Sequence, residues 1–242
     1  MLETKRSVLI DVFPISNFTP VTRAVGRSMS ALPDALVVVS DTCPFCPTVL
    51  AGLADLVKAG RLARLEVMNI EQHPDAVAAL GVRSVPWVRL GPFELDGLRS
   101  PAELKLWADR AGTRAGLAAY VAELLATGGL HKVIELCQRD ARYLDAIPLL
   151  VGDVTTDLHV RLGIGAVFEE LAGQPILARL VDALGSLANA SEARTRGDAC
   201  HYLALTRDRR AIPYIEPLLD DPDPGVRDVA HESLAVFGPK RR

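Results

Sequence analysis

Two closely spaced cysteines form the most reactive pattern in the chain. Cys43 and Cys46 enclose a Pro-Phe pair and follow residues 35–39, a short apolar run typical of a buried parallel strand. If a helix begins at this point, this spacing places both sulfur atoms on the same turn. An intramolecular disulfide could then form and break, so the pattern predicts thiol–disulfide exchange.

The start of that helix gives the two thiols different expected roles. We expect Cys43 at the N-cap and Pro44 at the first helical position, where a missing N–H costs nothing. The N–H groups of Phe45 and Cys46 would then point at the Cys43 sulfur and favour its thiolate, the nucleophile. Cys46 would lie deeper and attack the mixed disulfide formed at Cys43. The charge of nearby Asp41 would oppose the thiolate.

A cysteine pair can also be half of a zinc site, or be chemically inert. A zinc site needs four ligands, and the other two cysteines, Cys137 and Cys200, stand apart in the second half of the chain. His73 has no second ligand at a suitable spacing. We therefore expect no metal and no cofactor, and we interpret Cys137 and Cys200 as buried small hydrophobic residues.

The segments around the cysteine pair alternate between strand and helix patterns as far as Gly112. Strands are expected at residues 7–13, 35–39, 64–70, 87–90 and 93–95. Helices are expected at residues 17–31, from the cysteine pair to Gly60, at residues 74–80, and from Ser100 to Gly112. The resulting order, βαβαβαββα, predicts an α/β domain over residues 1–112 with a central sheet and helices on both faces.

Two motifs in this domain resemble the thioredoxin superfamily. The first is the strand with its Cys-Pro-Phe-Cys motif, and the second is Gly-Val-Arg-Ser-Val-Pro at residues 81–86. In that family the proline equivalent to Pro86 is cis and lies beside the disulfide. The residue before it, here Val85, offers its backbone N–H and C=O to a substrate strand. The resemblance implies that Cys43 and Cys46 are catalytic and that Val85 and Pro86 bind the substrate.

The details of the motifs depart from thioredoxins proper. These carry Gly-Pro between the cysteines, whereas Pro-Phe is nearer to glutaredoxins and related domains of disulfide reductases. Residues 95–99 lack the Gly-Gly pair with which glutaredoxins bind glutathione, so no glutathione-specific role is implied. Val37 occupies the position of the buried acid that aids proton transfer in thioredoxins.

The chain after Gly112 has a helical pattern with internal repeats. Related segments end in Arg161, Arg196 and Arg227, at intervals of 35 and 31 residues, and each opens a helix. These segments resemble the Asp-x-x-Val-Arg helix starts of HEAT repeats, and we expect an α-helical solenoid over residues 113–242. The resemblance implies that the repeats bind a protein partner along a concave face. We interpret the three arginines as structural.

Composition restricts the possible partners. The chain is 49% apolar and 24% charged with a formal net charge of -3, which is typical of a soluble globular protein without a nucleic-acid-binding surface. No apolar stretch reaches the roughly 18 residues of a transmembrane helix. The N-terminus lacks the pattern of a secretory signal. We therefore expect a cytoplasmic protein that binds neither nucleic acid nor membrane.

These features predict a thiol–disulfide oxidoreductase whose helical repeats dock a protein disulfide or dithiol substrate. An electron donor is also required, and the sequence does not identify it. Two other functions are compatible with the sequence. The protein could be an adapter whose α/β domain is only a scaffold, although the intact cysteine pair argues against this function. It could also be a redox sensor, in which the Cys43–Cys46 disulfide changes what the repeats bind.

Overall fold

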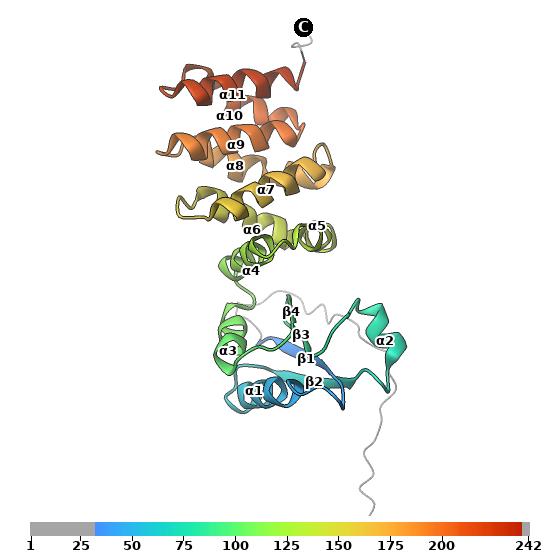
Figure 1. Ribbon diagram of the computed structural model, residues 1–242. Coiled ribbons are helices and arrows are strands. Elements are labelled where there is room, and N and C mark those ends of the chain that lie inside the picture. The colour runs from blue at the N-terminus through green and yellow to red at the C-terminus, as the bar shows by residue number, and fades with distance from the viewer. Residues whose placement is uncertain (1–31, 239–242) are drawn as a thin grey trace, which may run out of the picture. The chain divides into compact units, whose positions relative to one another are not determined.

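A computed structural model describes residues 32–238, which form a mixed sheet followed by a helical half (Figure 1). The strand expected at residues 7–13 and the helix expected at residues 17–31 lie outside this range. The predicted boundary at Gly112 falls in the short connection between two helices. Independent folding of residues 1–112 stays a prediction.

Within residues 32–238, the sheet contains four strands in the spatial order β2-β1-β3-β4. Strand β1 pairs with β2 in parallel, and the pairs β1–β3 and β3–β4 are antiparallel. The bounds are Asp34–Val39 for β1, Arg64–Asn69 for β2, Trp87–Leu90 for β3 and Phe93–Asp96 for β4. All four strands lie where the sequence predicts them, within one residue at each end.

Helices cover both faces of this sheet, as the alternation of elements predicts. Successive side chains of a strand point to opposite faces. Val37 therefore joins the cluster that includes α1 (Cys46–Lys58) and α3 (Pro101–Arg110), whereas Val38 packs with Val77 of α2 (Pro74–Ala79). Helix α3 begins where predicted, because Ser100 and Glu103 form a reciprocal capping box at its first turn.

The helical half begins two residues after Gly112. Helices α7, α9 and α11 lie side by side, with a second layer of shorter helices behind them (Figure 1). The α-helices are α4 (Arg114–Ala126), α5 (Leu130–Arg139), α6 (Ala141–Gly152), α7 (Leu158–Glu170), α8 (Val181–Leu187), α9 (Ala193–Leu205), α10 (Ile212–Ile215) and α11 (Pro224–Ala235). Three short 3-10 helices complete this half: η1 (Pro175–Leu180), η2 (Arg209–Ala211) and η3 (Glu216–Asp220).

The three repeated arginines make structural contacts, as predicted. Arg161 on α7 pairs with Asp198 on α9 at 2.7 Å. Arg196 on α9 makes a bidentate pair with the buried Asp221, with both N–O distances at 2.7 Å. Arg227 on α11 donates to the backbone carbonyl of Asp221 at 2.7 Å. The first pair joins α7 to α9, and the second joins α9 to the connection between η3 and α11.

An aromatic cluster joins the edge of the sheet to the helical half. Phe93 on β4 and Trp107 on α3 pack against Tyr120 of α4, with ring centroids 5.2 and 5.6 Å from the tyrosine ring. All three side chains are at most 2% exposed. The hydrophobic core is therefore continuous from the sheet into α4.

Polar contacts complete this junction at Glu94, on the edge strand β4. The Tyr120 hydroxyl accepts from the Glu94 N–H at 3.1 Å and donates to the Glu94 carbonyl at 2.6 Å. The buried carboxylate of Glu94 pairs with Lys132 and Arg139 of α5. Burial acts to raise the pKa of Glu94, but these two cations lower it below its ordinary value. The junction thus satisfies backbone groups that an edge strand leaves unpaired.

Within residues 32–238, no helix combines the length and the apolar character needed to cross a membrane.

The Tyr120 hydroxyl is expected to stabilise the fold through these two bonds. Tyr120→Phe keeps the ring but leaves the N–H and C=O of Glu94 buried and unpaired, which should cost about 1–3 kcal/mol of unfolding free energy. Urea unfolding of the full chain measures this loss. The matched control is Tyr214→Phe, which removes an exposed hydroxyl bond to Asp182 and should cost less than about 0.5 kcal/mol. Equal losses in the two variants would contradict this role of Tyr120.

Candidate active site

Three segments that are distant in sequence meet at one end of the sheet. In the parallel pair, Val39 of β1 lies opposite Asn69 of β2, so both strands have their carboxyl ends at the same end of the sheet. Strand β3 runs the other way, with Trp87 opposite Val38. Three connections therefore lie together at this end of the sheet: the cysteine loop after β1, the turn after Asn69 and the Val85–Pro86 segment before β3.

Helix α1 begins later than the sequence predicts. The expectation that Cys43 is the N-cap is wrong: the N-cap is Phe45, and Cys46 is the first helical residue. The cause is the second proline, Pro47. A helix that began at Pro44 would need the missing N–H of Pro47 for its first intrahelical bond, whereas a start at Cys46 places Pro47 among the positions that need none.

The predicted contact between the two cysteines is nevertheless present. The backbone N–H of Cys46 donates to the Cys43 sulfur over 3.2 Å. Both residues are free thiols. Cys46 is only 4% exposed, whereas Cys43 is partly open to solvent. The order of depth expected for an attacking and a resolving thiol is therefore confirmed.

The surroundings of the two sulfur atoms shift their pKa values in opposite directions. Burial acts to raise the pKa of Cys43, but hydrogen bonds from the Cys46 thiol and from the N–H groups of Phe45 and Cys46 lower it below its ordinary value. Burial, followed by the hydrogen bond to Cys43, raises the pKa of Cys46 to about 11. Cys43 is therefore the thiol that ionises first.

The Val85–Pro86 segment has the backbone conformation that the resemblance implies. The peptide bond between these two residues is cis, which confirms that prediction. Pro86 is buried, and its carbonyl accepts from the N–H of Gly97 at 2.9 Å. Val85 is half-buried and packs against the cluster of Val38, Val77 and Trp87. Its role in binding a substrate strand stays a prediction.

Sequence reasoning missed a polar pair at the same end of the sheet, formed by Ser40 and Glu71. The Ser40 hydroxyl donates to the Glu71 carboxylate at 2.6 Å. This bond, and further bonds from Asp41, hold the pKa of Glu71 below its ordinary value. Each residue follows the end of one of the two parallel strands. That placement was the available signal, because polar side chains at neighbouring carboxyl ends of parallel strands lie close together.

The remaining cysteines are fully buried, as predicted, and burial raises the pKa of both. In the part of the chain that the structure describes, no cluster of three or more His, Cys, Asp or Glu side chains has the arrangement of a metal site.

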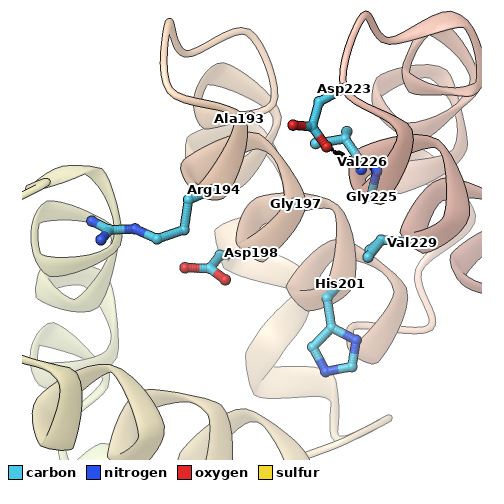
Figure 2. A pocket seen from close by; sticks show the side chains of 9 residues that line it. All are labelled: Ala193, Arg194, Gly197, Asp198, His201, Asp223, Gly225, Val226 and Val229. Atoms are coloured by element: carbon cyan, nitrogen blue, oxygen red, sulfur yellow. Dashed lines mark hydrogen bonds between the residues drawn. The ribbon is translucent and has the colours of Figure 1, made fainter.

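Surface grooves lie between the long helices of the helical half. One, of about 510 Å³, lies between α9 and α11, and its lining side chains include Arg194, Asp198 and His201 (Figure 2). The second, of about 380 Å³, lies between α7 and α9. Asp198 and His201 border both grooves, so the two form one continuous surface across α7, α9 and α11. We call this surface the helical groove.

Comparison with known proteins found no match to this chain, either among protein-family models or among curated proteins.

The opposite pKa shifts predict a large difference in thiol reactivity. The thiolate is the reactive form, so alkylation of Cys43 should begin at a pH below the ordinary cysteine value. Alkylation of Cys46 should become fast only as the pH approaches about 11. The rates can be measured separately by quenching at intervals and quantifying each labelled peptide by mass spectrometry. Faster labelling of Cys46 near neutral pH would reverse the assignment of roles.

Proposed function

We propose that this protein is a thiol–disulfide oxidoreductase that acts on a protein partner through Cys43 and Cys46. The observation that carries the proposal is the hydrogen bond from the Cys46 N–H to the Cys43 sulfur, together with the different depths of the two thiols. Together they provide a partly exposed, activated nucleophile just before α1 and a protected second thiol at its first residue, as dithiol exchange requires.

In the reducing direction, the Cys43 thiolate attacks one sulfur of a substrate disulfide. A mixed disulfide forms, and the other substrate sulfur leaves as a thiolate. Cys46 then loses its proton and attacks the Cys43 sulfur, which releases the second substrate thiolate. The substrate gains two electrons, and Cys43 and Cys46 become a disulfide. A dithiol donor must return two electrons to this disulfide, and the same steps in reverse would oxidise a dithiol substrate.

The arrangement of the sheet supports the finer proposal of a thioredoxin-like domain. A buried central strand leads into the cysteine pair, and an antiparallel strand begins directly after Pro86 at the same end of the sheet. In the family that the motifs resemble, this placement lets the residue before the proline pair with an extended substrate. Phe45 lies between the cysteines and is 52% exposed, so it offers an apolar contact to such a substrate.

The helical groove supports the proposal that the HEAT-like half docks the partner. Gly165 and Gly197, which have no side chains, line the groove and leave it open. The exposed apolar side chains of Leu158 and Leu162 on α7 also line it. Apolar side chains in that position gain stabilisation only when a partner covers them. Docking on a separate surface would raise the local concentration of a chosen substrate near Cys43.

Trapping a mixed disulfide tests the exchange reaction. Cys46→Ser removes the resolving thiol, so the variant should accumulate a covalent adduct with a model protein disulfide that the wild type reduces with turnover. Non-reducing electrophoresis followed by peptide mass spectrometry identifies the linkage. Cys43→Ser is the control and should form no adduct. If the wild type shows no reduction and Cys46→Ser forms no adduct while Cys43 still alkylates, the adapter function is favoured.

Filling the helical groove tests the docking role. An added Cβ at Gly165 or Gly197 meets only ordinary contacts, at 3.7 and 3.9 Å, so the backbone leaves room for a side chain to begin at both positions. A natural partner can be identified by its mixed disulfide with Cys46→Ser in a cell extract. The double variant Gly165→Gln, Gly197→Gln should slow reduction of that partner by about tenfold or more, the effect of roughly 1.4 kcal/mol of lost binding. Reduction of a small disulfide should be unchanged.

The matched control for that experiment places the same side chain on α8, in the other helical layer. Ser186→Gln adds an exposed Gln outside the groove and should leave both rates unchanged. If the groove variant and this control reduce the natural partner at the same rate, the proposed docking role of the groove is wrong.

A further inference from the structure

The loop that carries Cys43 is held at its first residue by contacts from two strands. Ser40 follows β1, and its hydroxyl oxygen lies 2.6 Å from the Glu71 carboxylate, 3.1 Å from the Thr42 hydroxyl and 3.3 Å from the Thr42 N–H. The Ser40 carbonyl accepts from the N–H of Cys43 at 3.4 Å. One serine therefore organises the turn that leads to the first cysteine.

Glu71 is itself fixed in place by the end of β2. The Asn69 side-chain oxygen accepts from the N–H groups of Glu71 and Gln72 at 2.8 and 3.2 Å. The N–H of Ile70 donates to the carbonyl of Val39, so the register of β1 and β2 continues into this turn. The Asn69 side chain thus fixes the backbone of the segment that presents the Glu71 carboxylate to Ser40.

We propose that Glu71 and Ser40 form a clamp that holds the loop from Ser40 to Phe45 and so presents the Cys43 sulfur to the N–H groups at the start of α1. In this role both are positioning residues for the proposed thiol–disulfide exchange, on which the inference rests. Neither acts as a nucleophile or transfers a proton to the substrate. The short distance is typical of a charge-assisted O–H to carboxylate bond, which has a narrow geometry.

The clamp and the negative charge of Glu71 have opposite effects on the pKa of Cys43. Among the described residues, the titratable group that interacts with the pair of thiols is Glu71, after β2. Asp41 lies in the loop and contacts Glu71. A carboxylate alone disfavours a nearby thiolate, so removal of its charge would lower a thiol pKa. Loss of the clamp would instead move the Cys43 sulfur away from its N–H donors and raise the Cys43 pKa. The two explanations predict shifts of opposite sign.

The pH profile of Cys43 alkylation in the full chain distinguishes these explanations. Ser40→Ala and Glu71→Ala should each raise the midpoint by about half to one pH unit, which slows alkylation below the midpoint about 3- to 10-fold. Because both variants break the same bond, the double variant should shift the midpoint no further than either single one. Ser40→Thr keeps the hydroxyl and should keep the wild-type midpoint.

Glu66→Gln is the matched control, since it removes an exposed carboxylate from β2 outside this contact and should not shift the midpoint. An unchanged or lowered midpoint in Glu71→Ala, additive shifts in the double variant, or a Ser40→Thr midpoint as high as that of Ser40→Ala would overturn the clamp. Urea unfolding checks that each variant is folded. A different result would contradict the proposed function: a wild-type protein that cannot reduce a protein disulfide, whatever the midpoints of Cys43 alkylation are.

Discussion

The hydrogen bond from the backbone N–H of Cys46 to the Cys43 sulfur is the interaction on which the candidate site depends. It exists because the first turn of a helix has N–H groups without intrahelical partners, and because the preceding loop brings a sulfur atom to them. The same contact separates the two thiols chemically. Hydrogen bonds favour ionisation of Cys43, whereas burial and the hydrogen bond to Cys43 raise the pKa of Cys46 to about 11.

The rest of the structure holds that geometry in place. Strand β1 is the central anchor: Val37 and Val38 are fully buried on opposite faces, so the strand that leads into the cysteine loop has little freedom to shift. Around the edge strand β4, Tyr120 and the cations of α5 join the sheet to the helical half through one continuous core. The thiol site is therefore carried on a firmly packed sheet.

Local sequence signals predicted most of the elements, and long-range contacts account for what they missed. The apolar run of β1, the Gly-Pro turn between β3 and β4 and the capping box at Ser100 each act within a few residues, so their elements were predictable. The start of α1 was displaced because two prolines compete for the same helical turn. The Ser40–Glu71 contact spans 31 residues and depends on the register of two strands, which no local pattern specifies.

Equilibration of the full chain with glutathione and glutathione disulfide tests the central claim most directly. The account predicts one reversible two-electron transition between the Cys43–Cys46 dithiol and disulfide, with the same midpoint from either direction. Acid quenching, alkylation and mass spectrometry assign the linked residues, and Cys43→Ser should lose the transition. A pair that stays fully reduced at every glutathione ratio, or an oxidised form that links Cys137 or Cys200, would contradict it.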